Sequence, residues 1–121
     1  MKYILLIHDE ERSWEKHGQA ERDQMMAAYR RFTQEIQSTG NYLAGAQLQP
    51  TASATSVRVR DGKRLVTDGP FAETREQLGG YYLIEAKDLD EAIAIAARVP
   101  SAAVGTIEVR PLVQAAASAS A

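Results

Sequence analysis

The pattern of apolar and polar residues divides the chain into short strands and two helices. Residues 2–8 form an almost purely apolar run, which is typical of a buried central strand. Residues 20–39 carry four apolar residues at steps of four, three and four, which share one face of a helix: Met25, Tyr29, Phe32 and Ile36. Gly40 follows where a helix C-terminal cap is common. The N-terminal third therefore predicts a strand and a long amphipathic helix.

The middle of the chain predicts strands and a tight hairpin. Residues 42–48 are favourable for a strand, which Pro50 ends. Residues 55–60 alternate between apolar and polar side chains, as a strand with two different faces does. Asp61-Gly62 is a strong signal for a two-residue hairpin turn. Residues 63–67 should therefore return antiparallel to the preceding strand.

The last third repeats the order strand, helix, strand. Residues 81–86 predict a strand, and Asp88 with Glu91 three residues later resembles a helix capping box. The predicted apolar face of the helix that follows consists of Leu89, Ala92, Ile93 and Ala96. Pro100 lies beyond the helix end, and residues 105–110 alternate as a final strand. Residues 10–18 are polar and charged, and we interpret them as a loop.

This element order predicts an α+β fold. A βαβ unit, a hairpin and a second βαβ unit resemble the ferredoxin-like split βαβ antiparallel sheet, here with an added strand. Each helix has one apolar face, so both should cover the same side of the sheet. The other side would then expose apolar side chains, which a second copy of the chain can cover. We therefore expect a homodimer.

Composition restricts the function further. The chain has 121 residues, a net charge of −2 and no cysteine, which predicts one cytoplasmic domain without disulfides. Neither nucleic acid nor a membrane is an expected partner, since the chain has no basic excess and no long apolar segment. We predict no metal or cofactor, because His/Cys clusters and glycine-rich phosphate loops are absent from the sequence. Residues 114–121 contain only Gln, Ala and Ser, and we expect a disordered tail there.

One turn concentrates candidate catalytic residues. Asp68-Gly69-Pro70 is a turn signal between two predicted strands, and Phe71 and Glu73 follow it directly. Two nearby carboxylates can divide the roles of acid and base, so Asp68 and Glu73 are catalytic candidates. Phe71 is a candidate ligand contact. The alternatives are turn formation by Asp68, solvation of Glu73 and anchoring of the loop by Phe71.

Four other side chains are candidates with structural alternatives. His8 at the end of the first strand can act as a general base or simply meet solvent. Trp14 can contact a ligand or pack its own segment on the body of the protein. Arg58 and Arg110 alternate with apolar neighbours and would point into the uncovered sheet face, where they can bind a carboxylate or phosphate group. The alternatives for both are a salt bridge with Glu108 or Glu85, or exposure to solvent.

The sequence also resembles a known family. The motif Thr67-Asp68-Gly69-Pro70-Phe71 and the later Gly79-Gly80-Tyr81-Tyr82 are similar to the signature of the DGPF-domain branch of the YCII-related proteins. The opening Lys2-Tyr3-Ile4-Leu5-Leu6-Ile7, the Gln49-Pro50 pair and residues 57–62 agree with it. The resemblance extends over residues 1–113, which we take as the domain.

The resemblance implies a dimeric α+β barrel and a partly conserved site. YCII relatives pair an Asp at the end of the first strand with a His early in the first helix. Asp9 matches that Asp, whereas residues 21–26 contain no His. The incomplete pair favours a dimeric small-molecule-binding or regulatory module, and DGPF relatives imply an extracytoplasmic-function sigma factor as partner. The alternative is a small dimeric enzyme using acid–base chemistry, since relatives include a dechlorinating enzyme of aromatic degradation.

Overall fold

The computed structural model describes residues 1–114. Its strands and helices follow the chain in this order: β1 (Lys2–Asp9), α1 (Glu11–Glu15), α2 (Gln19–Ser38), β2 (Tyr42–Gln47), β3 (Thr55–Arg60), β4 (Lys63–Asp68), β5 (Gln77–Glu85), α3 (Leu89–Ala97) and β6 (Thr106–Pro111). Short 3₁₀ turns cover Thr51–Ser53 and Pro100–Ala103. The predicted tail lies outside the described residues apart from Gln114, so the tail and the boundary at Val113 stay predictions.

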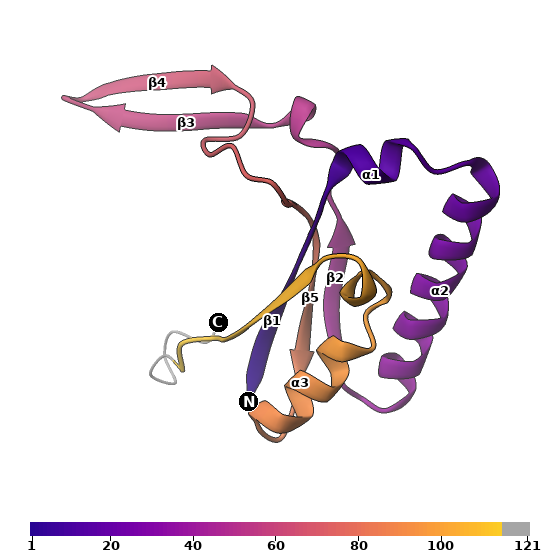
Figure 1. Cartoon of the computed structure of the whole chain (residues 1–121). Helices are drawn as coiled ribbons and strands as arrows, with labels where there is room; N and C mark the ends of the chain where they lie inside the picture. The colour runs from indigo at the N-terminus through magenta and orange to yellow at the C-terminus, as the bar shows by residue number, and fades with distance from the viewer. Residues whose placement is uncertain (115–121) are drawn as a thin grey trace.

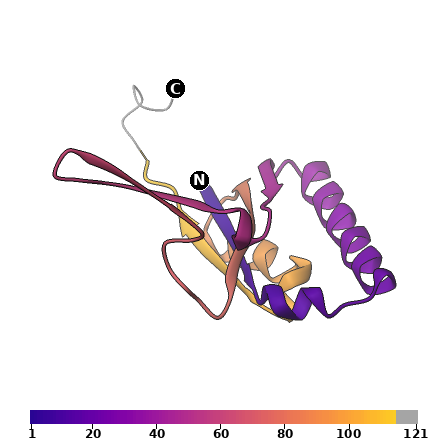
Figure 2. The ribbon, with the colours of Figure 1, turned by 90° about the horizontal axis from the view of Figure 1, so that it is seen from above.

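Four strands form one antiparallel sheet in the order β2-β5-β1-β6. The central pair comes from the first strand of each βαβ unit, which is the ferredoxin-like arrangement that the element order predicted. Figure 1 and Figure 2 show α2 and α3 on the same side of this sheet. The opposite side carries no helix among the described residues, and we call it the bare face.

The hydrophobic core lies between the sheet and the helices. Alternate residues of β1 point into it, as a strand with one helix-covered face requires: Tyr3, Leu5 and Ile7 are at most 7% exposed. Phe32 and Ile36 of α2 are buried against them, which confirms the predicted apolar face of that helix. The intervening β1 residues are partly exposed on the bare face: Ile4, Leu6 and His8.

The hairpin is present, but it does not extend the sheet. Asp61 and Gly62 both have positive φ, 52° and 73°, as a type I′ turn requires. β3 and β4 pair only with each other, so the predicted added strand is wrong. Instead, residues 55–68 project from the body as a two-stranded ribbon, which we call the arm (Figure 1).

Two other expectations require correction. Residues 10–18 are not all loop, because Glu11–Glu15 form the helix α1. The apolar face of α3 was predicted only in part: Ala92 and Ala96 are buried as predicted, but Ile95 is buried with them, whereas Leu89 and Ile93 are about half exposed. The capping box is confirmed, since Asp88 accepts a hydrogen bond from the Glu91 backbone N–H at 2.9 Å. Among the described helices, none is long and apolar enough to span a membrane.

Candidate functional site

A cavity of about 490 Å³ lies on the helix-covered side of the sheet. Its floor is formed by the ends of β1, β2 and β5, and its roof by α2. Segments from α1, residues 48–50 and the 3₁₀ turn at Pro100–Ala103 complete the wall. Segments that lie far apart in the sequence therefore meet here.

The polar end of the cavity is a chain of three side chains. Tyr29 of α2 donates its hydroxyl to Ser101 Oγ at 2.6 Å, and Ser101 Oγ donates to Asp9 Oδ2 at 3.4 Å. Ser101 is 4% exposed and is the polar residue buried with the core. Asp9 lies on the same face of β1 as Ile7 and points towards the helices. A carboxyl group is thereby held at the wall of an otherwise largely apolar space.

Burial sets the protonation behaviour of this group. Removal from water raises the pKa of Asp9 above its usual range, and the Ser101 hydrogen bond opposes part of that rise. Glu76 and Glu11 raise the pKa of Asp9 further by charge repulsion. The pKa of Tyr29 is also raised, mainly by burial, so its phenol stays protonated and donates. The polar end therefore combines one proton acceptor with fixed hydroxyl donors.

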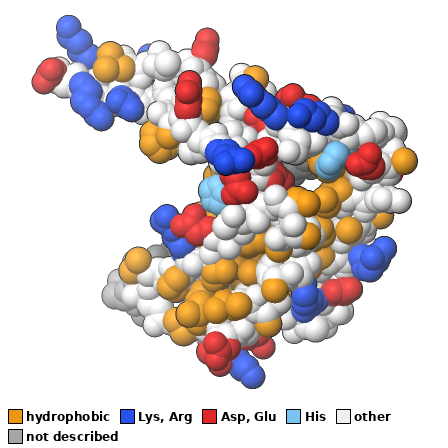
Figure 3. Space-filling view, viewed as in Figure 1, with side chains coloured by type: hydrophobic (Ala, Val, Ile, Leu, Met, Phe, Trp, Pro, Cys, Tyr) orange, Lys and Arg blue, Asp and Glu red, His pale blue; other side chains and the backbone are white. Residues whose placement is uncertain are grey.

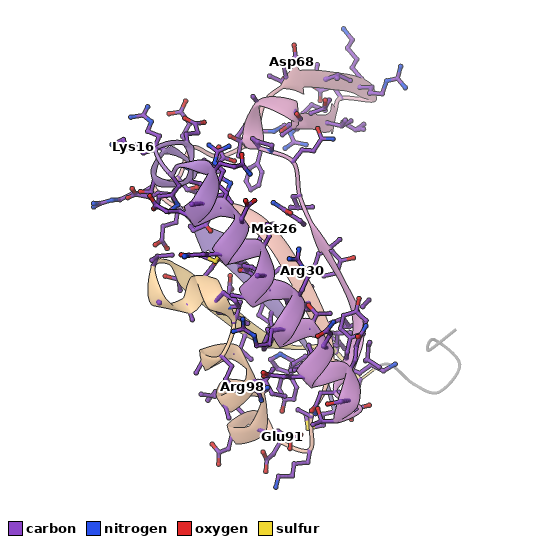
Figure 4. The ribbon with its side chains drawn as sticks, turned by 90° about the vertical axis from the view of Figure 1, so that its right-hand side faces the viewer. Lys16, Met26, Arg30, Asp68, Glu91 and Arg98 are labelled. Atoms are coloured by element: carbon purple, nitrogen blue, oxygen red, sulfur yellow. The ribbon has the colours of Figure 1, made fainter. Side chains whose placement is uncertain are left out.

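The remaining walls are mostly apolar and aromatic. Tyr82 of β5 fills the space beside β2, because Gly45 has no side chain: a Cβ there would lie 2.8 Å from the tyrosine ring. Met26 and Arg30 line the cavity from successive turns of α2, and Figure 4 shows both along one side of that helix. Arg30 is exposed and brings the positive charge of the lining, opposite in sign to Asp9.

The rim near the arm is fixed by Glu11. Its carboxylate accepts hydrogen bonds from the backbone N–H and the hydroxyl of Thr51, at 2.7 and 2.8 Å. The backbone N–H of Glu11 donates to Gln77 Oε1 at 3.0 Å. These bonds hold α1 against the segment that leads into the arm, and they position Trp14 in the cavity wall.

A more open groove of about 560 Å³ lies between α2 and the α3 region. Its charged side chains are largely paired: Arg98 binds Glu35 at 2.9 Å, and His17 Nε2 lies 3.7 Å from Glu21. Because this groove is more open and its Arg98 and Glu35 already bind each other, we take the cavity as the candidate site.

Of the candidates named from the sequence, Asp9 and Trp14 line the cavity. His8 and Arg110 lie on the bare face instead, both bound to Glu108, at 3.3 and 2.6 Å. His8 and Asp9 point to opposite sides of the sheet, as neighbours in a strand do. The paired glutamate for Arg110 was the structural alternative given for that residue.

The remaining candidates lie on or beside the arm. Asp68 ends β4, and Arg58 lies in β3, so the expectation that Arg58 points into the bare face is wrong. Phe71 is 80% exposed, and Glu73 is exposed in the loop that returns to β5. None of these four lines the cavity with Asp9.

Sequence reasoning missed Ser101, Tyr29 and Arg30. Tyr29 was assigned to the apolar face of the helix, which is correct, but its hydroxyl lies at the cavity. Ser101 follows Pro100 in a short turn, and no local pattern distinguishes it from a surface serine. Arg30 follows Tyr29 on α2, and its position was recognisable only once the neighbouring strands were placed.

Comparison with known proteins agrees with this fold. A solved structure of 5-chloro-2-hydroxyhydroquinone dehydrochlorinase from Burkholderia phenoliruptrix AC1100, in complex with 2,5-dihydroxybenzoquinone, is similar with a TM-score of 0.52 and 13% identity, covering 93% of each chain. An uncharacterised protein of Rhizobium meliloti (strain 1021) is 36% identical over 114 residues, or 93% of this chain and 92% of that one. The YCII-related domain model matches residues 1–116. The chain therefore belongs to the YCII-related family.

Proposed function

We propose that this chain is a small enzyme that binds a compact, largely apolar molecule in the cavity and uses Asp9 to move a proton. The observation that carries the proposal is the position of Asp9: a half-buried carboxyl group at the cavity wall, held by Ser101 and Tyr29. A raised pKa makes the ionised carboxylate a stronger base, and it leaves a larger fraction of the group protonated and available as a proton donor near neutral pH.

The size and lining of the cavity suggest the class of substrate. A volume of about 490 Å³ falls in the usual range for small-molecule sites. Trp14, Tyr42 and Tyr82 favour a ring over a flexible polar chain. The dehydrochlorinase named above supports proton chemistry as a reaction class, since loss of HCl requires a base. We extend only that reaction class to this chain.

A second candidate is a binding or regulatory module without catalysis. It is favoured by the lining of the cavity, which includes no histidine among the described residues to complete an acid–base pair with Asp9. Under this alternative the same cavity would sense a metabolite. A sigma-factor partner, the DGPF branch and a cytoplasmic location remain proposals that rest on the sequence.

We propose a homodimer in either case. The bare face carries partly exposed apolar side chains from the two central strands: Ile4, Leu6, Tyr81 and Leu83. A second copy placed face to face would cover them and form the barrel that the family resemblance implies.

The experiment compares wild type, Asp9→Asn and Asp68→Asn with 2,5-dihydroxybenzoquinone and its chlorinated hydroquinone precursors as probes. Thermal shift measures binding, and chloride release measures turnover. We expect Asp9→Asn to retain binding and to lose at least 100-fold in turnover, because its amide cannot accept the proton. Asp68→Asn, exposed on the arm, should behave as wild type. Equal turnover by Asp9→Asn and wild type would reject the catalytic proposal, whereas binding without any turnover by wild type would favour the sensing module.

A further inference from the structure

The arm is a two-stranded ribbon with two chemically different sides. The β3–β4 register places Val57 opposite Val66 and Val59 opposite Arg64, so the three valines share one side with a single cation, Arg64. Arg58, Arg60 and Lys63 lie on the other side, together with Leu65. We call these the valine side and the basic side. A ribbon built to be surrounded by water would not need a valine side.

Both sides are exposed in the single chain. Val57, Val59 and Val66 are 59%, 62% and 58% exposed, although cross-strand valines normally bury one another against a third layer. An isolated two-stranded ribbon is marginally stable in water, because it has no layer to pack on. The return loop adds Phe71 at 80% exposure. The arm therefore has the composition of a segment that packs on something outside its own chain.

The arm projects to one particular side of the sheet. Figure 1 and Figure 2 show that it projects to the side of the sheet opposite α2, which is the side of the bare face. Figure 3 shows a notch between the arm and the body on that side. A layer placed on the bare face would enter this notch and lie within reach of the arm.

The area needed for a stable dimer points to the same arrangement. Four strands of this length present a flat face of roughly 450 Å², given about 3.3 Å per residue and about 4.8 Å between strands. A standard interface buries about 800 Å² on each partner. The bare face alone falls short of that area. Each copy would also bury one side of its own arm and the surface that the partner's arm covers. At roughly 200 Å² each, these two areas would bring the total close to that of a standard interface.

We propose that the arm of each copy clasps the second copy, with its valine side packed on the partner and its basic side in water. The occupant is a second copy because the arm projects to the side of the bare face, and because one two-fold axis then covers both surfaces on both chains. This proposal concerns assembly and does not depend on whether the cavity is catalytic.

The test uses neighbouring residues on opposite sides of the arm. Val66→Asp changes the valine side, and Leu65→Asp makes a similar change on the basic side. Sedimentation velocity of the full chain over a range of concentrations gives the dimer dissociation constant of each. We expect Val66→Asp to raise that constant at least tenfold and Leu65→Asp to change it less than threefold. A monomeric wild type, or equal effects of the two changes, would overturn the clasp.

A second measurement remains informative if an aspartate disrupts the arm itself. The chain has no cysteine, so single introduced cysteines can be cross-linked selectively. Protein carrying Val59→Cys is mixed with tagged protein carrying Leu6→Cys and treated with a short bismaleimide. We expect a covalent dimer between the two variants, and little when Leu65→Cys replaces Val59→Cys. Equal cross-linking of the two arm positions to Leu6→Cys would contradict the proposed packing side.

Discussion

The cavity beneath α2 is built from side chains that lie far apart in the sequence, whereas the β3–β4 arm is built from one contiguous segment. At the cavity, Asp9, Ser101 and Tyr29 come from segments up to 92 residues apart and are linked by hydrogen bonds. At the end of the arm, the recognisable Asp68-Gly69-Pro70-Phe71 motif is contiguous, and its aromatic ring is 80% exposed. A contiguous motif is easy to find in a sequence, but a chemically perturbed carboxyl group requires burial by distant residues.

The largest effect is expected from Gly105→Ala, behind the polar end of the cavity. A Cβ at Gly105 would lie 2.2 Å from the carbonyl oxygen of His8 and 2.9 Å from Cβ of Asp9. Because backbone is in the way, β1 or β6 has to shift, and we expect a loss of about 3 kcal/mol in the free energy of unfolding. Thermal unfolding should show it as a fall in Tm of roughly 10–15 °C.

Gly18→Ala is the matched control for that change. A Cβ at Gly18 meets no atom within 4 Å, so the same substitution should alter stability by less than about 1 kcal/mol. If both variants lost equal stability, the close approach of β6 to Asp9 would not be the cause. The cavity would then be no more tightly constrained than the surface.

The next effect compares two serine hydroxyls, one in each region. Ser101→Ala leaves the buried Tyr29 hydroxyl without its acceptor, and we expect a loss of about 2 kcal/mol. Ser56→Ala removes a bond of 2.7 Å to the Gly69 carbonyl at the base of the arm, where water can replace it, and about 0.5 kcal/mol is expected. Thermal unfolding of the two variants measures the difference. Equal losses would mean that the arm base is as firmly packed as the core.

The fold was predictable from the sequence because it rests on local patterns. The apolar run of β1, the helical spacing of Phe32 and Ile36 and the turn at Asp61-Gly62 each act within a few residues. The arm was predicted to be part of the main sheet, which is wrong. Alternation indicates that a strand has an apolar and a polar face, but it does not indicate what packs on either face. The same limit explains the wrong prediction for Arg58. The neighbouring valines suggested that one face of β3 is covered by helices, but β3 lies outside the helix-covered sheet.

The site was predictable only in part, for a related physical reason. Asp9 was found from its place at the end of β1 and from the family resemblance. Ser101 acquires its importance from burial next to Asp9, and burial of a residue 92 positions away is a property of packing. The Asp68 turn attracted attention because turn chemistry and site chemistry use the same residue types.

The smallest effect on stability is expected from Asp9→Asn. This change tests whether ionisation of Asp9 destabilises the folded protein. The pKa of Asp9 is raised in the folded chain, chiefly by burial, so the folded state binds more protons than the unfolded state between the usual pKa near 3.8 and the raised value. Stability therefore falls as the pH rises through that window, and the deficit persists at neutral pH. Asn cannot ionise and has no such deficit.

We accordingly expect Asp9→Asn to be more stable than wild type at pH 7 by a few tenths of a kcal/mol, since the group is only half-buried and solvent screens it. That corresponds to a rise in Tm of about 1–2 °C, which should shrink towards pH 3.5. A wild type that is more stable than Asp9→Asn at pH 7 would mean that the ionised carboxylate is stabilised by its surroundings. Asp9 would then have a structural role. A functional explanation is needed only if Asp9 lowers the stability of the protein that contains it.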